Sequence, residues 1–270
     1  MGRDFPEAAS GIVLDTVAFG EADKVVTLYC QDLGRITAIA KGAFKSKKRF
    51  VNKLEPCSQL RFLYQRPRHD TGLFFLKEAE LLDARIHIRQ DYRRYVAAAY
   101  FCELLLLLTR EHDPDEPLYA LLCWTLDTLN QAEQPLRIIP LAILNLLCIL
   151  GYQPELAHCS RCHQPIGPHQ RYRFLPGGGC LLCSRCQPET APTPRLSLQT
   201  IRILLSALTL RLERLHRLHL SSHNLVEAAE VLHAYTLHLV QRDIHAFAPF
   251  RQLLDIADKR TSSSYKGVAV

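Results

Sequence analysis

Two cysteine pairs in the second half of the chain have the spacing of a metal site. Cys159 and Cys162 are followed by Cys183 and Cys186 after an interval of twenty residues. Each Cys-x-x-Cys pair bends into a tight knuckle that directs two thiolates at one ion, and four sulfurs complete a tetrahedron around Zn²⁺. Because four protein ligands leave no position for a water nucleophile, we predict that this zinc ion is structural.

Other residues close to the pairs leave alternatives open. Cys180 could replace Cys183, although Cys180 has no partner in a Cys-x-x-Cys pair. The nearby His158, His163 and His169 could also ligate, but we expect them to be exposed loop residues because four cysteines already complete a set. Four reduced thiols without a metal ion are the remaining alternative.

A basic run between residues 35 and 53 is the second feature that could do chemistry. The sequence RITAIAKGAFKSKKRFVNK contains no acidic residue and interleaves its cations with two phenylalanines. Cations neutralise phosphates while aromatic rings stack on bases, a combination that favours single-stranded nucleic acid; the alternative is a solvated charged face. The predicted DNA-binding residues are Arg35, Lys41, Phe44, Lys45, Lys47, Lys48, Arg49, Phe50 and Lys53.

The elements around the basic run predict a small barrel. Five short runs rich in β-branched and aromatic residues lie at 11–19, 24–30, 35–41, 57–65 and 72–81. The fourth run alternates well, with Leu60, Phe62 and Tyr64 on one face. Five strands in about eighty residues suit an OB-fold, in which loops flanking a strand face bind oligonucleotides, although the spacing also permits an SH3-like barrel.

From Asp91 onward the apolar residues recur at helical spacing, which predicts a helical bundle. We expect helices at 91–109, 118–130, 136–150, 198–218 and 225–240. The fold class is therefore α+β and multidomain, with a cysteine-, proline- and glycine-rich insertion that needs a metal ion to hold it together. The predicted parts are an OB-fold at 1–82, a helical domain at 83–157 and 195–258, a zinc insertion at 158–194 and a loose tail at 259–270.

Composition and missing motifs narrow the class of protein further. The chain of 270 residues has a formal net charge of +6, lacks an N-terminal secretory pattern, and has no apolar stretch long enough to cross a bilayer. We therefore expect a reducing, cytoplasmic compartment, in which the five other cysteines in apolar segments act as small hydrophobic residues. No phosphate-binding loop, dinucleotide-binding turn or serine-hydrolase elbow is present, so we expect no enzymatic activity.

Three ordered segments of the sequence resemble the RecO family of bacterial recombination and repair proteins. The segment GIVLDTVAFGEADKVVTLYCQDLGRITAIAKGAFKSKKRF is similar to the family's barrel. LAILNLLCILGYQPELAHCSRC and GGGCLLCSRC resemble the approach to the zinc element and its second half. The chain departs from the family pattern in its extra Cys180 and in a looser match after Leu225, so no partner surface on the helical domain is assigned.

The resemblance implies a recombination mediator of the bacterial cytoplasm that is associated with the nucleoid. Such a protein binds single-stranded DNA and the single-strand-binding protein SSB, anneals complementary strands, and with RecR helps RecA load onto coated DNA. Some members of the family lack the zinc cysteines, which agrees with a structural role for the metal. Two other classes stay open: a zinc-stabilised protein-interaction adaptor without DNA binding, and a metal-dependent nuclease.

Overall fold

The computed structural model describes residues 6–66, 73–168, 171–186 and 193–266, and the chain divides into two compact units. The first unit combines Met1–Gln90 with Leu105–Leu126, and the second combines Asp91–Leu104 with Asp127–Val270. The segment 105–126 thus belongs with the N-terminal strands, whereas the sequence suggested a boundary at residue 82. A helical period shows where a helix runs but not which core the helix packs against.

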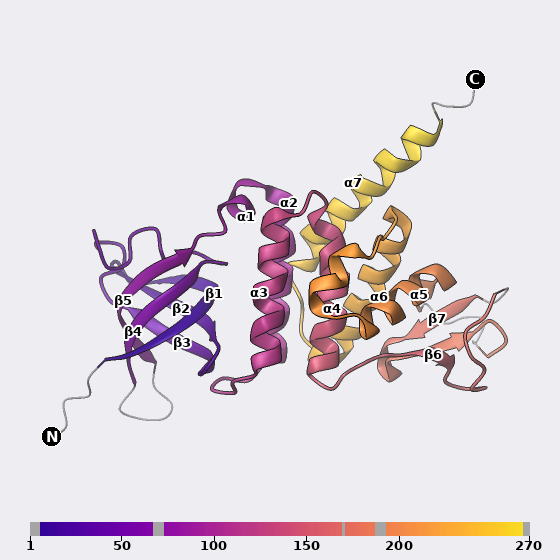
Figure 1. Ribbon diagram of the computed structural model, residues 1–270, viewed down its shortest axis with the longest axis horizontal. Coiled ribbons are helices and arrows are strands. Elements are labelled where there is room, and N and C mark those ends of the chain that lie inside the picture. Colours follow the sequence, from indigo (N-terminus) through magenta and orange to yellow (C-terminus); the bar gives the residue numbers. More distant parts are fainter. Residues whose placement is uncertain (1–5, 67–72, 169–170, 187–192, 267–270) are drawn as a thin grey trace. The chain divides into compact units, whose positions relative to one another are not determined.

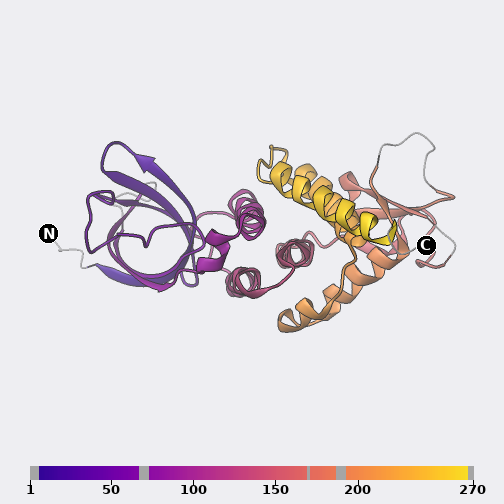
Figure 2. The same ribbon diagram turned by 90° about the horizontal axis from the view of Figure 1, so that it is seen from above.

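The N-terminal strands close into a barrel in the order β1-β2-β3-β5-β4 (Figures 1 and 2). β3 and β5 pair in parallel, and the other neighbouring strands pair antiparallel. This architecture confirms the predicted OB-type barrel. The strands are β1 (Glu7–Phe19), β2 (Asp23–Cys30), β3 (Gly34–Ala40), β4 (Gln59–Gln65) and β5 (Phe74–Asp83).

The barrel core follows from strand alternation. Leu60, Phe62 and Tyr64 of β4 are buried, as the period of two in the sequence predicts. They pack with alternate residues of the other strands and with Phe50 and Leu54 of the loop that joins β3 to β4. Burying aromatic and branched side chains on one face of every strand supplies the hydrophobic free energy that closes the barrel.

The turn between β2 and β3 depends on Gly34. Its φ of +66° lies in the left-handed region, which side chains with a Cβ rarely adopt. A Cβ at this position would also lie 2.5 Å from the carbonyl carbon of Asp113. Glycine is therefore required here both by the turn and by the close approach of the segment after α2.

The helices mostly follow the predicted ranges. Among the described residues, no helix is both long enough and apolar enough to cross a membrane. Ser197 and Ser221 cap the first turns of α5 and α6 by accepting backbone N–H groups. The helical elements are α1 (Ile86–Gln90), α2 (Tyr92–Leu108), α3 (Glu116–Gln131), η1 (Pro135–Arg137), α4 (Ile138–Ile149), α5 (Leu198–Thr209), η3 (Leu212–Arg217), α6 (Ser222–Val240) and α7 (Phe247–Lys266).

Two predictions about the C-terminal third were wrong. The single helix expected at 198–218 is broken, because Leu210 and Arg211 are extended between α5 and η3. The expected loose tail at 259–270 is helical as far as Lys266, where α7 ends, and residues 267–270 lie outside the described part of the chain. The sequence did not predict this helix because residues 259–266 are mostly polar, and too few apolar residues remain to show a helical period.

The cysteine-rich insertion contains a small sheet, called the cysteine sheet below, with the strand order β6-β8-β7-β9. Its aromatic residues Tyr172 and Phe174 are buried, and the Phe174 ring lies edge-on to Tyr235 of α6 at 5.6 Å between centroids. The insertion thus completes a core by packing on α6. Its elements are β6 (Glu155–Cys159), β7 (Tyr172–Leu175), η2 (Pro176–Gly178), β8 (Cys180–Cys183) and β9 (Arg195–Leu196).

Candidate metal centre and nucleic-acid interface

The four predicted cysteine ligands converge on one point. The Sγ atoms of Cys159, Cys162, Cys183 and Cys186 all lie within 4.8 Å of one another, and the Cys162 and Cys183 sulfurs are 3.8 Å apart. Tetrahedral coordination with metal–sulfur bonds of about 2.3 Å places the sulfurs about 3.8 Å apart. The donor set therefore fits a metal ion held by four thiolates.

The cysteine sheet brings the two pairs together. β6 and β8 run in parallel and end in Cys159 and Cys183, so both knuckles begin at the same edge. The Ser160 N–H donates to the Leu181 carbonyl at 2.8 Å and links the first knuckle to β8. His163 follows the first pair with a φ of 56°, in the left-handed region, and its N–H donates to the Cys159 carbonyl at 2.8 Å and closes the turn.

The backbone around Cys159 favours its thiolate form. Burial by itself raises the pKa of this thiol, but hydrogen bonds from the backbone N–H groups of Cys162, Cys183 and Arg161 outweigh burial and lower the pKa to about 6. Desolvation, together with hydrogen bonds from the other sulfurs, raises the pKa of Cys186 to about 12. A bound cation would stabilise the thiolate at every position.

Neither Cys180 nor a histidine belongs to this cluster in the described part of the chain. Cys180 begins β8 at the opposite end from Cys183, so strand geometry separates it from the other sulfurs. His158 is half exposed and its Nδ1 lies 3.8 Å from Glu155, while His163 is exposed. His169 lies outside the described residues.

The basic run lies where the sequence predicts it, in the connection between β3 and β4. We call residues 41–58 the basic loop. Lys41, Lys45, Lys47 and Lys48 are exposed, and within the described residues none of them forms an ion pair. Four unpaired ammonium groups on one loop produce a local positive potential that attracts polyanions.

Three other cations of the run are bound by the protein itself. Arg35 lies in β3, half buried, and its Nη1 donates to the Leu106 carbonyl at 2.7 Å. Arg49 donates to the carbonyls of Lys41 at 3.2 Å and Lys77 at 3.4 Å. The Lys53 ammonium donates to three carbonyls, those of Lys48, Arg49 and Ala79. These contacts give all three side chains a structural role.

The two aromatic residues of the run have opposite environments. Phe44 is 54% exposed, whereas Phe50 is 3% exposed and belongs to the barrel core. Phe50 therefore has no free ring face for a base, which argues against the stacking role predicted for it. Each ring has one charged and one apolar neighbour in sequence, Arg49 and Val51 for Phe50 and Lys45 and Ala43 for Phe44, so no local pattern distinguishes the buried ring from the exposed one.

Two residues outside the run extend the same surface. Phe75 of β5 is half buried, and the ammonium groups of Lys41 and Lys77 lie 5.4 and 5.8 Å from its ring centroid. Sequence reasoning missed both Phe75 and Lys77 because they lie more than twenty residues beyond the basic run. The alternation in β5, where Phe74 and Leu76 are buried, is the signal that could have found them.

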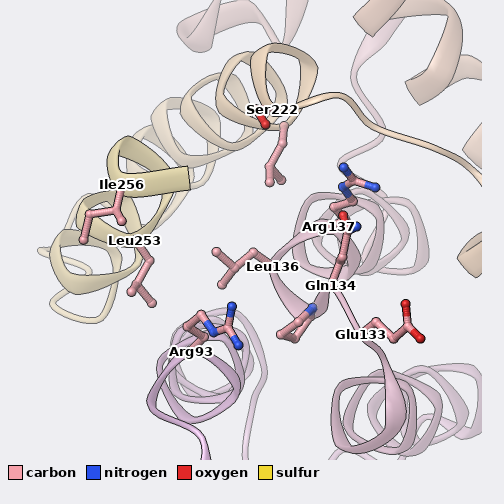
Figure 3. Close-up of a pocket in the computed structure, with 10 residues that line it drawn as sticks. Arg93, Glu133, Gln134, Leu136, Arg137, Ser222, Leu253 and Ile256 are labelled. Carbon is pink, nitrogen blue, oxygen red and sulfur yellow. The ribbon is translucent and has the colours of Figure 1, made fainter. Parts of the chain in front are cut away.

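A groove of about 660 Å³ lies in the second unit, between the beginnings of α2 and α6, η1 and α7 (Figure 3). Leu136, Leu253 and Ile256 form apolar walls, and Arg93 and Arg137 lie beside them. Burial lowers the pKa of Arg137, and no carboxylate in the described ranges pairs with this guanidinium. The Nη1 atom of Arg137 lies 3.1 Å from His219 Nδ1. An apolar groove beside a cation suits a ligand that carries both an apolar group and a carboxylate.

Fold and site together define a class of protein: an OB-type barrel with a basic loop, followed by helices with an insertion whose four cysteines could hold a metal ion. The family described as "Recombination protein O N terminal" matches residues 6–85, and "Recombination protein O C terminal" matches residues 89–246. The chain therefore belongs to the RecO family, as its sequence resemblance predicts.

Individual relatives agree with the family assignment over most of the chain. The chain is 32% identical over 238 residues to the DNA repair protein RecO of Syntrophus aciditrophicus, a match that covers 87% of this chain and 91% of the relative. It is 31% identical over 248 residues to the DNA repair protein RecO of Syntrophotalea carbinolica, covering 92% and 95%. The barrel and the helical part are thus matched together, in the same order.

Proposed function

We propose that this protein binds single-stranded DNA through the basic loop and acts in DNA repair and homologous recombination as a mediator. The observation that carries the proposal is the group of four exposed lysines that form no ion pair with any described residue, on the same loop as the exposed ring of Phe44. Its relatives are named as DNA repair proteins, which supports the same role. The role places the protein in the bacterial cytoplasm, at the nucleoid.

The mechanism we propose is electrostatic and involves no chemical step, so the protein is not an enzyme. Lysines 41, 45, 47 and 48 neutralise phosphates, which releases counterions and lowers the repulsion between two strands. Complementary strands can then approach and anneal. An adaptor that binds only proteins would show no DNA affinity, and a nuclease would shorten strands in the presence of Mg²⁺ or Mn²⁺.

We further propose that the protein contacts SSB and RecR and assists the loading of RecA onto coated DNA. The groove beside Arg137 supports a partner-binding role, because it combines apolar walls with a guanidinium that has no carboxylate partner among the described residues, and this combination fits a peptide with apolar and acidic side chains. We propose SSB as the partner that supplies this peptide. Arg137→Glu should then weaken binding to SSB without changing affinity for bare DNA.

The metal ion of the four-cysteine centre is proposed to be zinc with a structural role. Four thiolates at tetrahedral spacing are the ligands of structural zinc sites, and they leave no open coordination position. The ion would hold the two knuckles together and fix the cysteine sheet on α6. Elemental analysis of the purified protein tests this proposal, with one zinc per chain expected.

The experiment that tests DNA binding is a salt titration of the variant Lys47→Glu, Lys48→Glu. Binding of a fluorescent oligothymidine should weaken on the order of tenfold or more at low salt, and the slope of log affinity against log salt should fall by roughly 1.4 for two lost phosphate contacts. Arg211→Glu with Arg214→Glu, at two exposed arginines of the second unit, is the matched control and should change little.

Annealing gives the second measurement. The wild type should accelerate annealing of complementary strands coated with SSB, and the double lysine reversal should lose most of this acceleration. If the wild type failed to shift oligothymidine even in low-salt buffer, the proposed function would be wrong. Unchanged affinity of the lysine variant would remove the basic loop from the interface.

A further inference from the structure

Two lysines converge on the ring of Phe75 at the junction of β3 and β5. The ammonium groups of Lys41 and Lys77 lie 5.4 and 5.8 Å from the ring centroid, within cation–π range. Within the described part of the chain neither lysine forms an ion pair. Folding thus gathers two like charges around one ring with no carboxylate among the described residues paired to either, and an anion at this position would relieve their repulsion.

The strand register places this group on the outside of the barrel. Phe75 lies opposite Ile39 in the parallel pairing of β3 with β5, and its neighbours Phe74 and Leu76 point into the core. Alternate residues share a face, so Phe75 and Lys77 both face outward. Arg49 donates to the carbonyls of Lys41 and Lys77 and so links the residue that follows β3 to β5.

A second ring with an ammonium group lies at the start of the basic loop. The Lys24 ammonium is 5.3 Å from the centroid of Phe44. The Phe44 N–H donates to the Ala22 carbonyl at 3.0 Å, and this hydrogen bond ties the ring to the turn between β1 and β2. In OB-folds this turn borders the oligonucleotide-binding face. Lys24 is also paired with Glu55 at 3.0 Å, so its charge is neutralised locally.

We infer that Phe75 and Phe44 stack on bases of the single strand and that Lys41 and Lys77 neutralise the adjoining phosphates. The DNA path then crosses the outer face of β3 and β5 and does not stay on the basic loop. This inference rests on the proposed function and deepens it. Only unpaired bases expose a flat face to a protein ring, so the two phenylalanines also select single-stranded over double-stranded DNA.

Substitutions at Phe75 test the stacking contact by fluorescence anisotropy with oligothymidine. Phe75→Ala should weaken binding by roughly 5- to 150-fold, the range for one lost base–aromatic stack. Phe75→Leu keeps an apolar side chain but no aromatic face and should lose nearly as much, whereas Phe75→Trp should bind as well as the wild type. Tyr92→Ala, which removes a 64%-exposed ring from the second unit, is the control and should have no effect.

Two further measurements separate stacking from charge. An oligomer of abasic deoxyribose phosphates has no bases to stack, so the wild type and Phe75→Ala should bind it equally. Phe75→Ala should leave the salt slope unchanged, whereas Lys77→Gln should lower it by roughly 0.7, the value for one phosphate. Circular dichroism of each variant establishes that the barrel stays folded.

The outcomes distinguish this inference from the proposed function. If the wild type binds oligothymidine but Phe75→Ala and Phe75→Leu bind equally well, the path over β5 is wrong while binding through the basic loop stands. If the wild type bound the abasic oligomer as tightly as oligothymidine, the proposed base stacking would also be wrong. No binding by the wild type at all would overturn the proposed function itself.

Discussion

The barrel and the cysteine sheet keep their strands together by different means. The barrel buries aromatic and branched side chains from five strands and from the basic loop in one core. The cysteine sheet consists of short strands, and its two knuckles are joined by four sulfurs within 4.8 Å of one another. Because a hydrophobic core holds the barrel together, its charged residues remain available to bind a ligand. In the cysteine sheet, the reactive residues are the same ones that hold the two knuckles together.

This difference also affects how a single residue can be interpreted. In the cysteine sheet, all four predicted ligands have the same environment, because their sulfur atoms lie together in one cluster that could hold a metal ion. In the basic run, cations of the same type have different roles, since some bond to backbone carbonyls and others face solvent. Metal ligands that lie at a fixed spacing in the sequence are therefore easier to predict than the residues of a charged binding surface.

Loss of the metal should produce the largest effect. Cys159→Ser with Cys183→Ser removes a ligand from each pair, and structural zinc contributes about 10–16 kcal/mol of apparent binding free energy in isolated finger peptides. We expect loss of the metal ion and a much lower melting temperature for the second unit, measured by elemental analysis and calorimetry. Cys180→Ser should retain the metal; if it did not, the assignment of the four ligands would need revision.

Phe50→Ala should have the next largest effect, on the barrel. Removing a buried phenylalanine side chain costs about 3–5 kcal/mol of unfolding free energy, and Phe50 is 3% exposed. Phe44→Ala, at a ring that is 54% exposed, should cost less than about 1 kcal/mol. Urea denaturation measures both values, and similar losses would contradict the contrast between the two rings.

A substitution at Lys53 tests whether this cation is structural or binds DNA, and its expected effect on stability is smaller than that of Phe50→Ala. Lys53→Met removes an ammonium that donates to three carbonyls and should cost about 1–3 kcal/mol of unfolding free energy. Its salt slope for DNA binding should stay that of the wild type. Lys45→Met is the matched comparison: we expect unchanged stability and a slope lower by roughly 0.7. If Lys45→Met lowered stability and Lys53→Met lowered the salt slope, Lys45 would be the structural cation and Lys53 the one that contacts DNA.

The smallest effect concerns His233 in the second unit, whose ring stacks on Phe247 with centroids 3.4 Å apart. Burial, and secondarily the charge of Arg251, lower the pKa of His233 from 6.5 to about 4. Above pH 6.5 the ring is neutral in both states. Between pH 6.5 and 4 the unfolded chain binds a proton that the folded chain does not, so the free energy of unfolding falls as pH falls.

His233→Gln removes this titration and should flatten the pH dependence of stability over the same interval. The difference should be on the order of 1 kcal/mol, because the ring is only partly buried and solvent screens its charge. Chemical denaturation at several pH values from 4 to 7 measures it. A variant with the slope of the wild type would show that His233 takes up its proton equally readily in the folded and the unfolded chain.

Several elements could be read from the sequence because their signals are local. The alternation of Leu60, Phe62 and Tyr64 predicts β4, and the paired Cys-x-x-Cys motifs predict that four cysteines lie together. The break after Thr209 and the helix from 259 to Lys266 could not be read in the same way. Leu210 and Arg211 continue the helical pattern of polar and apolar residues, so nothing in the sequence marks the point where the backbone becomes extended.

The sequence by itself determined the barrel, the group of four cysteines and the family, since each depends on a pattern that neighbouring residues carry. Only the tertiary structure decided which cations of the basic run are free, because carbonyls of Leu106, Lys77 and Ala79 bind Arg35, Arg49 and Lys53 from distant segments. The same holds for Phe75, which lies beside Lys41 through the pairing of β3 with β5. Contacts between residues far apart in the chain follow from closure of the barrel, and a linear pattern does not contain them.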